Sequence, residues 1–350
     1  MSTSAQFLNP AEAARQLGVS AKALRLYEQR GLISPVRSRA GWRTYGPDEM
    51  VRAKEIVALR ALGFSLVQVA RVLAGDVLGL EPALVAHQAS IEARIHQLVG
   101  TVAKVRQLRA ELALGKMPPS GELVRVLQTP ISPNIAFDLP WPWGGERFEL
   151  RNIESLNYII GPLGCGKTRL AQRLAEVLPG AAFIGLERLA NGGAAAQAQL
   201  DSDAALRSRV ELALAWLVDE GASVSPALVA LLAGLEVEGP SIFIVDMLEQ
   251  GLDQPTQEAL IVYLRCRSCE ARPLFVLTRS CAILDLTAVG PSEAIILCPA
   301  NHSPPSYVAP FPGTPGYEAV ATCLASPEVR ARTEGVIAWR PTMQSVGGLK

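Results

Sequence analysis

One segment near the middle of the chain has the residue types and the spacing of a phosphate-binding loop. The run Gly161-Pro-Leu-Gly-Cys-Gly-Lys-Thr168 matches G-x-x-x-x-G-K-[ST] at every fixed position. Glycines permit a tight turn whose N–H groups point at phosphate oxygens, the lysine adds a positive charge, and the threonine hydroxyl ligates magnesium. The sequence therefore predicts a site for ATP and Mg²⁺, with the nucleotide-binding residues Gly161, Gly164, Cys165, Gly166, Lys167 and Thr168.

The segments on either side of this loop support that interpretation. The apolar run 156–160 predicts a buried strand, and 168–178 predicts a helix. Phosphate capture at a helix N-terminus requires this order of strand, loop and helix. A chance glycine-rich turn is the alternative, and the Lys-Thr ending with both flanking elements disfavours it.

A second acidic position follows another apolar run. Ser241-Ile-Phe-Ile-Val-Asp246 predicts a buried strand that ends in a carboxylate, and we assign Asp246 to magnesium, directly or through water. Helix 255–269 and strand 273–279 come next. Strands and helices that alternate in this way predict an α/β domain with a mainly parallel sheet and its ligand at the carboxyl ends of the strands.

This region resembles the nucleotide-binding domain of ABC-type ATPases. The resemblance rests on a Walker A motif at 161–168, a Walker B motif at 242–246 and a D-loop-like Gly251-Leu-Asp253. It implies the P-loop fold and phosphate binding.

Departures from that family's pattern bear on hydrolysis. Met247 stands where the family has its catalytic glutamate, Arg279 stands where it has its switch histidine, and 222–226 lacks the double glycine of the signature motif. Hydrolysis should be slow unless Glu249 or Glu187 orients water, because general-base assistance is worth about 10²–10⁴-fold. Arg279 could instead contact a γ-phosphate, with a surface salt bridge as its alternative. The catalytic candidates are Glu249 and Arg279, in a weak ATPase at most.

The first 75 residues predict a helix-turn-helix domain. A helix that follows Asn9-Pro10 ends at Gly18, and Ser20 can cap a second helix that runs to about Arg30. A basic hairpin at 37–45 follows, and then two helical stretches near 47–61 and 65–74. Helices in this spacing can place one of their number in the major groove of DNA.

Five motifs in this part resemble the DNA-binding domain of MerR transcription regulators. They are Leu17-Gly-Val-Ser20, Leu24-Arg-Leu-Tyr-Glu28, Gly31-Leu-Ile33, Gly41-Trp-Arg-Thr-Tyr45 and Leu62-Gly-Phe-Ser-Leu66. The resemblance implies a winged helix-turn-helix whose recognition helix and wing contact DNA through Ser20, Lys22, Arg25, Tyr27, Arg37, Arg39, Arg43 and Tyr45. A solvated surface charge is the alternative for each basic residue, and packing inside the hairpin is the alternative for Tyr45. Ala23 and Leu26 depart from the family pattern.

Residues 76–114 predict one long helix with a coiled-coil seam. Its apolar positions recur mainly at steps of three and four residues, namely Leu84, Ile91, Ile95, Leu98, Val102, Val105, Leu108 and Leu112. We expect a homodimer through this seam, which is antiparallel in the resembling family. The resemblance also implies double-stranded promoter DNA and RNA polymerase as partners.

Composition agrees with two unlike halves. Residues 1–112 hold 15 Lys+Arg against 9 Asp+Glu, and the remainder holds 18 against 24. A basic front half suits a polyanion such as DNA. Six scattered cysteines and the lack of a leader or an 18-residue apolar run favour a cytoplasmic protein that does not span a membrane.

The predicted domains are a DNA-binding head at 1–75, a dimerisation helix at 76–114, a Pro- and Gly-rich linker at 115–140 and a P-loop domain at 141–350. The leading hypothesis is a transcription regulator whose P-loop domain binds ATP and Mg²⁺ as a switch. One alternative is a DNA-tethered ATPase or P-loop phosphotransferase. Another is a docking module that holds a structural nucleotide.

Overall fold

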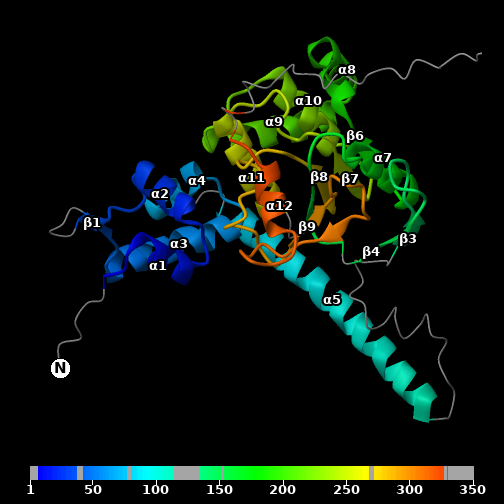
Figure 1. Ribbon diagram of the computed structural model, residues 1–350. Coiled ribbons are helices and arrows are strands. Elements are labelled where there is room, and N and C mark those ends of the chain that lie inside the picture. Colours follow the sequence, from blue (N-terminus) through cyan, green and yellow to red (C-terminus); the bar gives the residue numbers. More distant parts are fainter. Residues whose placement is uncertain are drawn as a thin grey trace, which may run out of the picture.

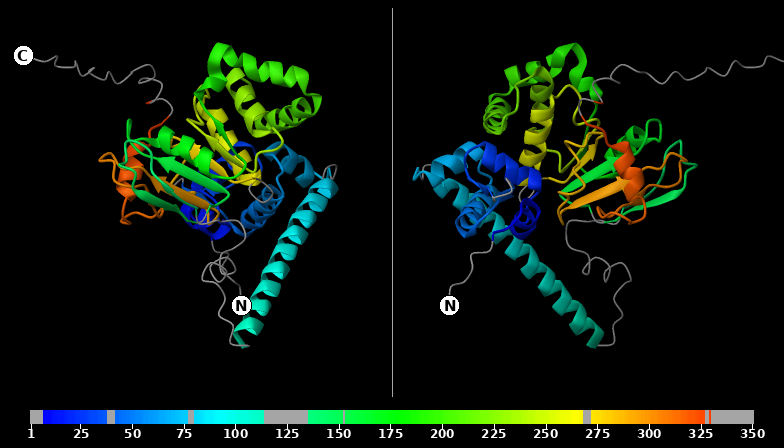
Figure 2. Two further views of the ribbon diagram at one scale, coloured as in Figure 1. Left: turned by 90° about the vertical axis from the view of Figure 1, so that its right-hand side faces the viewer. Right: turned by 60° about the vertical axis from the view of Figure 1, so that its left-hand side comes forward.

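The computed structural model describes residues 7–37, 42–76, 80–113, 135–151, 153–267, 272–326 and 329. It contains a helical head, a long single helix and an α/β domain (Figure 1). The head lies against one side of the α/β domain, and the long helix extends away from both in every view (Figures 1 and 2).

The head consists of four helices and a short hairpin. Its elements are α1 Pro10–Leu17, α2 Ala21–Gln29, β1 Val36–Arg37, β2 Arg43–Thr44, α3 Pro47–Ala61 and α4 Leu66–Leu73. Asn9 and Glu12 form a capping box at the start of α1, and Gly18 ends this helix in a left-handed conformation (φ 69°). Ser20 caps α2 by accepting a hydrogen bond from Ala23 N. The helix boundaries predicted from these caps are confirmed.

A single apolar core holds the head together. It gathers Leu17 and Leu24 from the helix-turn-helix, Tyr45 from the end of the hairpin, and Ile56 and Val69 from α3 and α4. Strands β1 and β2 pair antiparallel, with Val36 opposite Thr44. Arg39 lies outside the described residues.

The long helix α5, Leu80–Ala113, has 34 residues and is therefore about 50 Å long. Six of the eight predicted seam positions are exposed, namely Leu84, Ile91, Ile95, Val102, Val105 and Leu112. Leu108 is buried, and the side chain of Leu98 lies outside the described part. Among the described residues, no helix combines the length and apolar character that a membrane span requires.

The α/β domain is built on a six-stranded sheet. Its order is β10-β9-β5-β8-β7-β6, and every neighbouring pair is parallel except β10 with β9. The strands are β5 Leu156–Ile160, β6 Ala181–Ile184, β7 Ile242–Val245, β8 Leu274–Leu277, β9 Glu293–Leu297 and β10 Ser306–Tyr307. The mainly parallel sheet predicted for this region is confirmed.

Side chains that alternate along the strands bury both faces of the sheet. Ile159, Ile244 and Phe275 pack with helix α7, Lys167–Val177, and with a hairpin of β3 Ile135–Asp138 and β4 Arg147–Leu150. On the other face, the sheet packs against α9 Ala204–Asp219, α10 Pro226–Leu235, α11 Gln254–Arg267 and α12 Tyr317–Cys323. Continuous apolar strands are typical of a parallel sheet that is covered on both faces.

Two parts of this domain differ from the sequence prediction. The linker predicted at 115–140 ends before residue 135, because residues 135–138 form β3 and pair with β4; residues 114–134 lie outside the described part. Sequence patterns also assigned no elements between 179 and 240. The structure places β6, the 3₁₀ segment Leu186–Gly193, α8 Ala194–Ser202, α9 and α10 there.

Candidate functional site

The phosphate-binding loop joins β5 to the N-terminus of α7, at the carboxyl edge of the sheet. A Cβ atom on Gly161 would lie 2.4 Å from the carbonyl oxygen of Cys298. Gly166 has φ 99°, and a Cβ there would lie 2.7 Å from Pro142 Cδ and 2.7 Å from Trp143 Cη2. Gly161 is therefore required by the close approach of the Cys298 backbone, and Gly166 is required by the side chains of Pro142 and Trp143 and by its left-handed conformation.

Lys167 and Thr168 occupy the first turn of α7. The Lys167 ammonium donates hydrogen bonds of 2.8 Å to the carbonyl oxygens of Gly161 and Pro162, so it lies against the loop itself. The Thr168 hydroxyl donates to Asp246 Oδ2 at 2.9 Å. The structure thus brings together the hydroxyl and the carboxylate that the sequence assigned to magnesium.

The donor set at this edge of the sheet fits a nucleotide with its metal. Strand β8 lies between β5 and β7, and the loop after β5 and Asp246 after β7 open on the same edge. A hydroxyl and a carboxylate are oxygen ligands of the kind that Mg²⁺ prefers. Because the crowded glycine positions admit no side chain, backbone lines the loop. Phosphate oxygens need such exposed backbone N–H groups as donors.

Burial raises the pKa of Asp246 above its ordinary value. The hydrogen bond from Thr168 and the charges of Arg188 and Lys167 oppose this shift. A bound cation would stabilise the ionised form of this buried carboxylate, because it supplies a positive charge beside it.

Arg188, which sequence patterns did not single out, clamps the turn after β7. Its guanidinium donates to the carbonyl oxygens of Gly185 (2.8 Å), Asp246 (2.9 Å) and Met247 (2.8 Å). Met247 has φ 47°, an unusual conformation for a residue with a side chain. Arg188 thus fixes the backbone next to the magnesium-ligand candidate. It lies in the irregular segment after β6, where no motif marks it.

The two catalytic candidates lie together. Glu249 is buried, and its Oε1 accepts a hydrogen bond from Arg279 N at 2.9 Å. This bond joins the turn after β7 to the end of β8. Glu187 Oε1 accepts from Gly185 N at 3.0 Å, so this carboxylate shapes its own turn. Each glutamate therefore has a structural partner, and their assignment to water orientation stays a prediction.

Two tryptophans precede the loop and differ in exposure. Trp143 is 2% exposed, and its Nε1–H donates to the carbonyl oxygen of Ser303 at 3.0 Å. Packing, rather than stacking on a base, is therefore the role of Trp143. Trp141 is 62% exposed, on the segment that covers the phosphate-binding loop.

Cys165, in the phosphate-binding loop, lies beside Cys298, which follows β9, and both thiols are free. A hydrogen bond from Cys298 and the charge of Lys167 lower the pKa of Cys165 to about 6, against the effect of burial. The same hydrogen bond and burial raise the pKa of Cys298. Lys167 Nζ lies 3.7 Å from Cys165 Sγ, so its charge favours the ionised form of this thiol, which burial disfavours.

The predicted DNA contacts fall into two groups. Tyr27 and Tyr45 are 5% and 0% exposed, and the Tyr45 hydroxyl donates to Glu28. Both rings belong to the core of the head, so both have a packing role, and their assignment as DNA contacts stays a prediction. The other described members of the set lie on the surface or at a helix start, and these are Ser20, Lys22, Arg25, Arg37 and Arg43.

Two of the surface cations have partners within the chain. Arg43 forms an ion pair with Glu28 at 2.9 Å, which ties the hairpin to α2. Lys22 forms an ion pair with Glu258 of α11, in the α/β domain.

Comparison with known proteins identifies the head. Residues 8–76 match the family model described as MerR HTH family regulatory protein. A "Probable heavy metal-dependent transcriptional regulator" of Haemophilus influenzae is 47% identical over 68 residues, which are 19% of this chain and 53% of that protein. The chain thus spans about half the length of the curated relatives that it matches.

Solved structures show weaker likenesses. A MerR family regulator that lacks the sensor domain, bound to promoter DNA, is 21% identical with a TM-score of 0.26, over 32% of this chain and 92% of that one. A bacterial ABC transporter cassette is 15% identical with a TM-score of 0.34, over 50% of this chain and 96% of that one. The N-terminal domain is a MerR-type helix-turn-helix domain.

Proposed function

We propose that this protein is a dimeric, DNA-binding transcription regulator whose α/β domain binds ATP and Mg²⁺ as its effector, with slow or no hydrolysis. The observation that carries the proposal is the 2.9 Å contact between Thr168 and Asp246, beside a loop where Gly161 and Gly166 admit no side chain. These features share one chain with a MerR-type head.

Nucleotide would be held by four groups of this chain. The backbone of 161–166 and the Lys167 ammonium suit the phosphates, whereas the Thr168 hydroxyl and Asp246 suit the metal. Magnesium held by Thr168 and Asp246 would supply positive charge that favours phosphate binding. Arg188 holds the carbonyls of Asp246 and Met247 and keeps this turn in place.

Slow hydrolysis is expected because no free carboxylate follows Asp246 directly. Met247 offers no carboxylate to orient water, and Glu249 is buried with its Oε1 engaged by Arg279 N. A ligand that persists without turnover acts through its differential affinity for two conformations. This favours a switch over a motor.

Dimerisation would cover the exposed apolar positions of α5. Ile91, Ile95 and Val102 are each about half exposed on a helix that extends away from both domains (Figure 1). An apolar stripe of this length is normally covered by a partner helix. A second copy would present two basic heads to a two-fold symmetric promoter site.

The test follows radiolabelled ATP with magnesium on the full chain. Wild type should retain intact ATP, and Lys167→Ala should lose most of it. Arg173→Ala, a surface variant on the same helix, is the matched control and should bind as wild type does. Rapid cleavage that depends on Lys167 would favour the DNA-tethered ATPase instead. Equal retention by Lys167→Ala would overturn the nucleotide site.

A further inference from the structure

The DNA-binding head is docked on the α/β domain through a buried polar contact. Glu220, at the end of α9, has a side chain that is 1% exposed. Its Oε1 accepts from Arg60 Nη1 at 2.6 Å and from Leu66 N at 2.5 Å. An ion pair this well buried is costly to leave without a partner, so the two domains form a specific contact.

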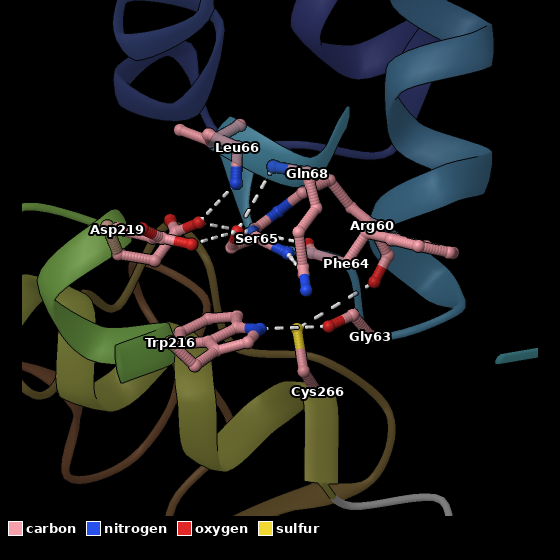
Figure 3. Close-up of polar contacts among 10 residues, drawn as sticks. Arg60, Gly63, Phe64, Ser65, Leu66, Gln68, Trp216, Asp219 and Cys266 are labelled. Atoms are coloured by element: carbon pink, nitrogen blue, oxygen red, sulfur yellow. Dashed lines mark hydrogen bonds and ion pairs between the residues drawn. The ribbon is translucent and has the colours of Figure 1, made fainter. Parts of the chain in front are cut away.

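Neighbouring groups extend this contact. Trp216 Nε1–H donates to the carbonyl oxygen of Gly63 at 2.9 Å, and the Ser65 hydroxyl donates to Asp219 at 3.1 Å (Figure 3). The Arg60 guanidinium also lies 5.3 Å from the centre of the Trp216 ring. The turn between α3 and α4 therefore fits the end of α9 with matched donors and acceptors.

Docking also reaches the recognition helix α2. Lys22, in the set of predicted DNA contacts, forms an ion pair with Glu258 of α11. At the other end of α2, a Cβ on Gly221 would lie 2.9 Å from Arg30 Nη2. The α/β domain thus lies beside the helix that the MerR resemblance places in the major groove.

Helix α11 connects this contact to the nucleotide site. Asp253, in the D-loop-like turn, caps α11 by accepting from Thr256 N at 2.9 Å. Gln257, next to Glu258, donates to the carbonyl oxygen of Leu252 at 2.7 Å and accepts from the Ser280 hydroxyl at 2.6 Å. The residue that holds Lys22 therefore sits on a helix that is anchored to the turns after β7 and β8.

We propose that the surface formed by the end of α9 and by α11 is a docking site for the DNA-binding head of the same chain, where Glu258 competes with DNA phosphate for Lys22. In this docked state the head is held away from DNA. Binding of nucleotide moves the turn at 246–253. This movement shifts α11 and releases the head from the α/β domain. This inference rests on the proposed function, because nucleotide supplies the release.

The first experiment couples amines to carboxylates with a zero-length carbodiimide on the full chain, and mass spectrometry detects the Lys22–Glu258 peptide. This peptide should form in the protein alone and fall at least fivefold with saturating duplex DNA selected in vitro by the wild type. ATP and magnesium should lower it as well. Coupling that saturating DNA leaves unchanged would overturn the proposal.

The second experiment measures the affinity for the same duplex without nucleotide. Glu258→Gln and Trp216→Phe each remove one docking contact and change no predicted DNA contact. Each should bind DNA about five- to tenfold more tightly, because the docked fraction falls. Glu211→Gln removes an exposed charge from α9 and is the matched control. Unchanged affinity in both docking variants, with thermal unfolding like that of wild type, would contradict the proposal.

The two experiments separate the docking proposal from the proposed function. Coupling that responds to DNA but not to ATP supports docking and argues against ATP as the effector. Bound ATP together with coupling that DNA does not change leaves the nucleotide site standing and refutes docking.

Discussion

Gly164→Ala and Gly166→Ala form a matched pair that tests the geometry of the phosphate-binding loop. Both glycines have left-handed backbones, with φ 80° and 99°. This conformation costs an alanine about 1–2 kcal/mol at either position. Only Gly166 is also crowded, since its Cβ would lie 2.7 Å from both Pro142 and Trp143, whereas nothing lies within 4 Å of a Cβ on Gly164.

The crowding sets the difference between the two variants. Overpacking a well-packed site costs about 1–3 kcal/mol. Gly164→Ala should therefore lower the free energy of unfolding of the α/β domain by about 1–2 kcal/mol, and Gly166→Ala by about 2–5 kcal/mol. Urea denaturation followed by tryptophan fluorescence measures this, with the α/β transition fitted separately from that of the head. Equal losses in the two variants would refute the packing of Trp143 against the loop.

Three further predictions concern a carboxylate, a thiol and the long helix. Asp246→Asn should be at least as stable as wild type at neutral pH, because burial raises the pKa of Asp246 and its ionised form costs stability. Thermal melts should show the difference in stability between the two proteins narrowing as the pH falls. The variant should also lose magnesium-dependent ATP binding. Cys165 is 1% exposed and should be alkylated far more slowly than the exposed Cys281 in the native protein, whereas both thiols should react after unfolding in urea; equal rates in the native protein would contradict the burial of Cys165. The double variant Ile95→Lys/Val102→Lys should sediment as a monomer, and a dimer that persists would contradict pairing through α5.

Local signals explain what the sequence could predict. Asn9, Gly18 and Ser20 determine helix ends by hydrogen bonds within a few residues, so the boundaries of α1 and α2 follow from the residue types alone. The phosphate-binding loop is also recognisable from a short motif. The contacts that crowd its two fixed glycines come from elsewhere in the chain, from Cys298 at Gly161 and from Pro142 and Trp143 at Gly166, and the motif alone does not reveal them.

Features that depend on distant contacts could not be predicted. Arg188 reaches Asp246 and Met247, which lie nearly 60 residues away, and no pattern marks such a clamp. Tyr27 and Tyr45 looked like DNA contacts because the family pattern names their positions, but only the packed head shows that both rings are buried.

Sequence patterns also could not predict that the head docks on the α/β domain. Arg60 and Glu220 are 160 residues apart, and each alone resembles an ordinary surface charge. Their pairing depends on how two separately folded domains meet. The ion pair of Lys22 with Glu258 also depends on how the domains meet, and it gives a predicted DNA contact a partner within the chain.

The central claim is that nucleotide at the phosphate-binding loop controls DNA binding by the head. The most direct test measures the affinity of the full chain for the selected duplex with and without ATP and magnesium, beside Lys167→Ala. ATP should tighten DNA binding by the wild type several-fold and should leave the DNA affinity of Lys167→Ala unchanged. DNA affinity that is the same with and without ATP, in wild-type protein shown to have ATP bound, would contradict the claim.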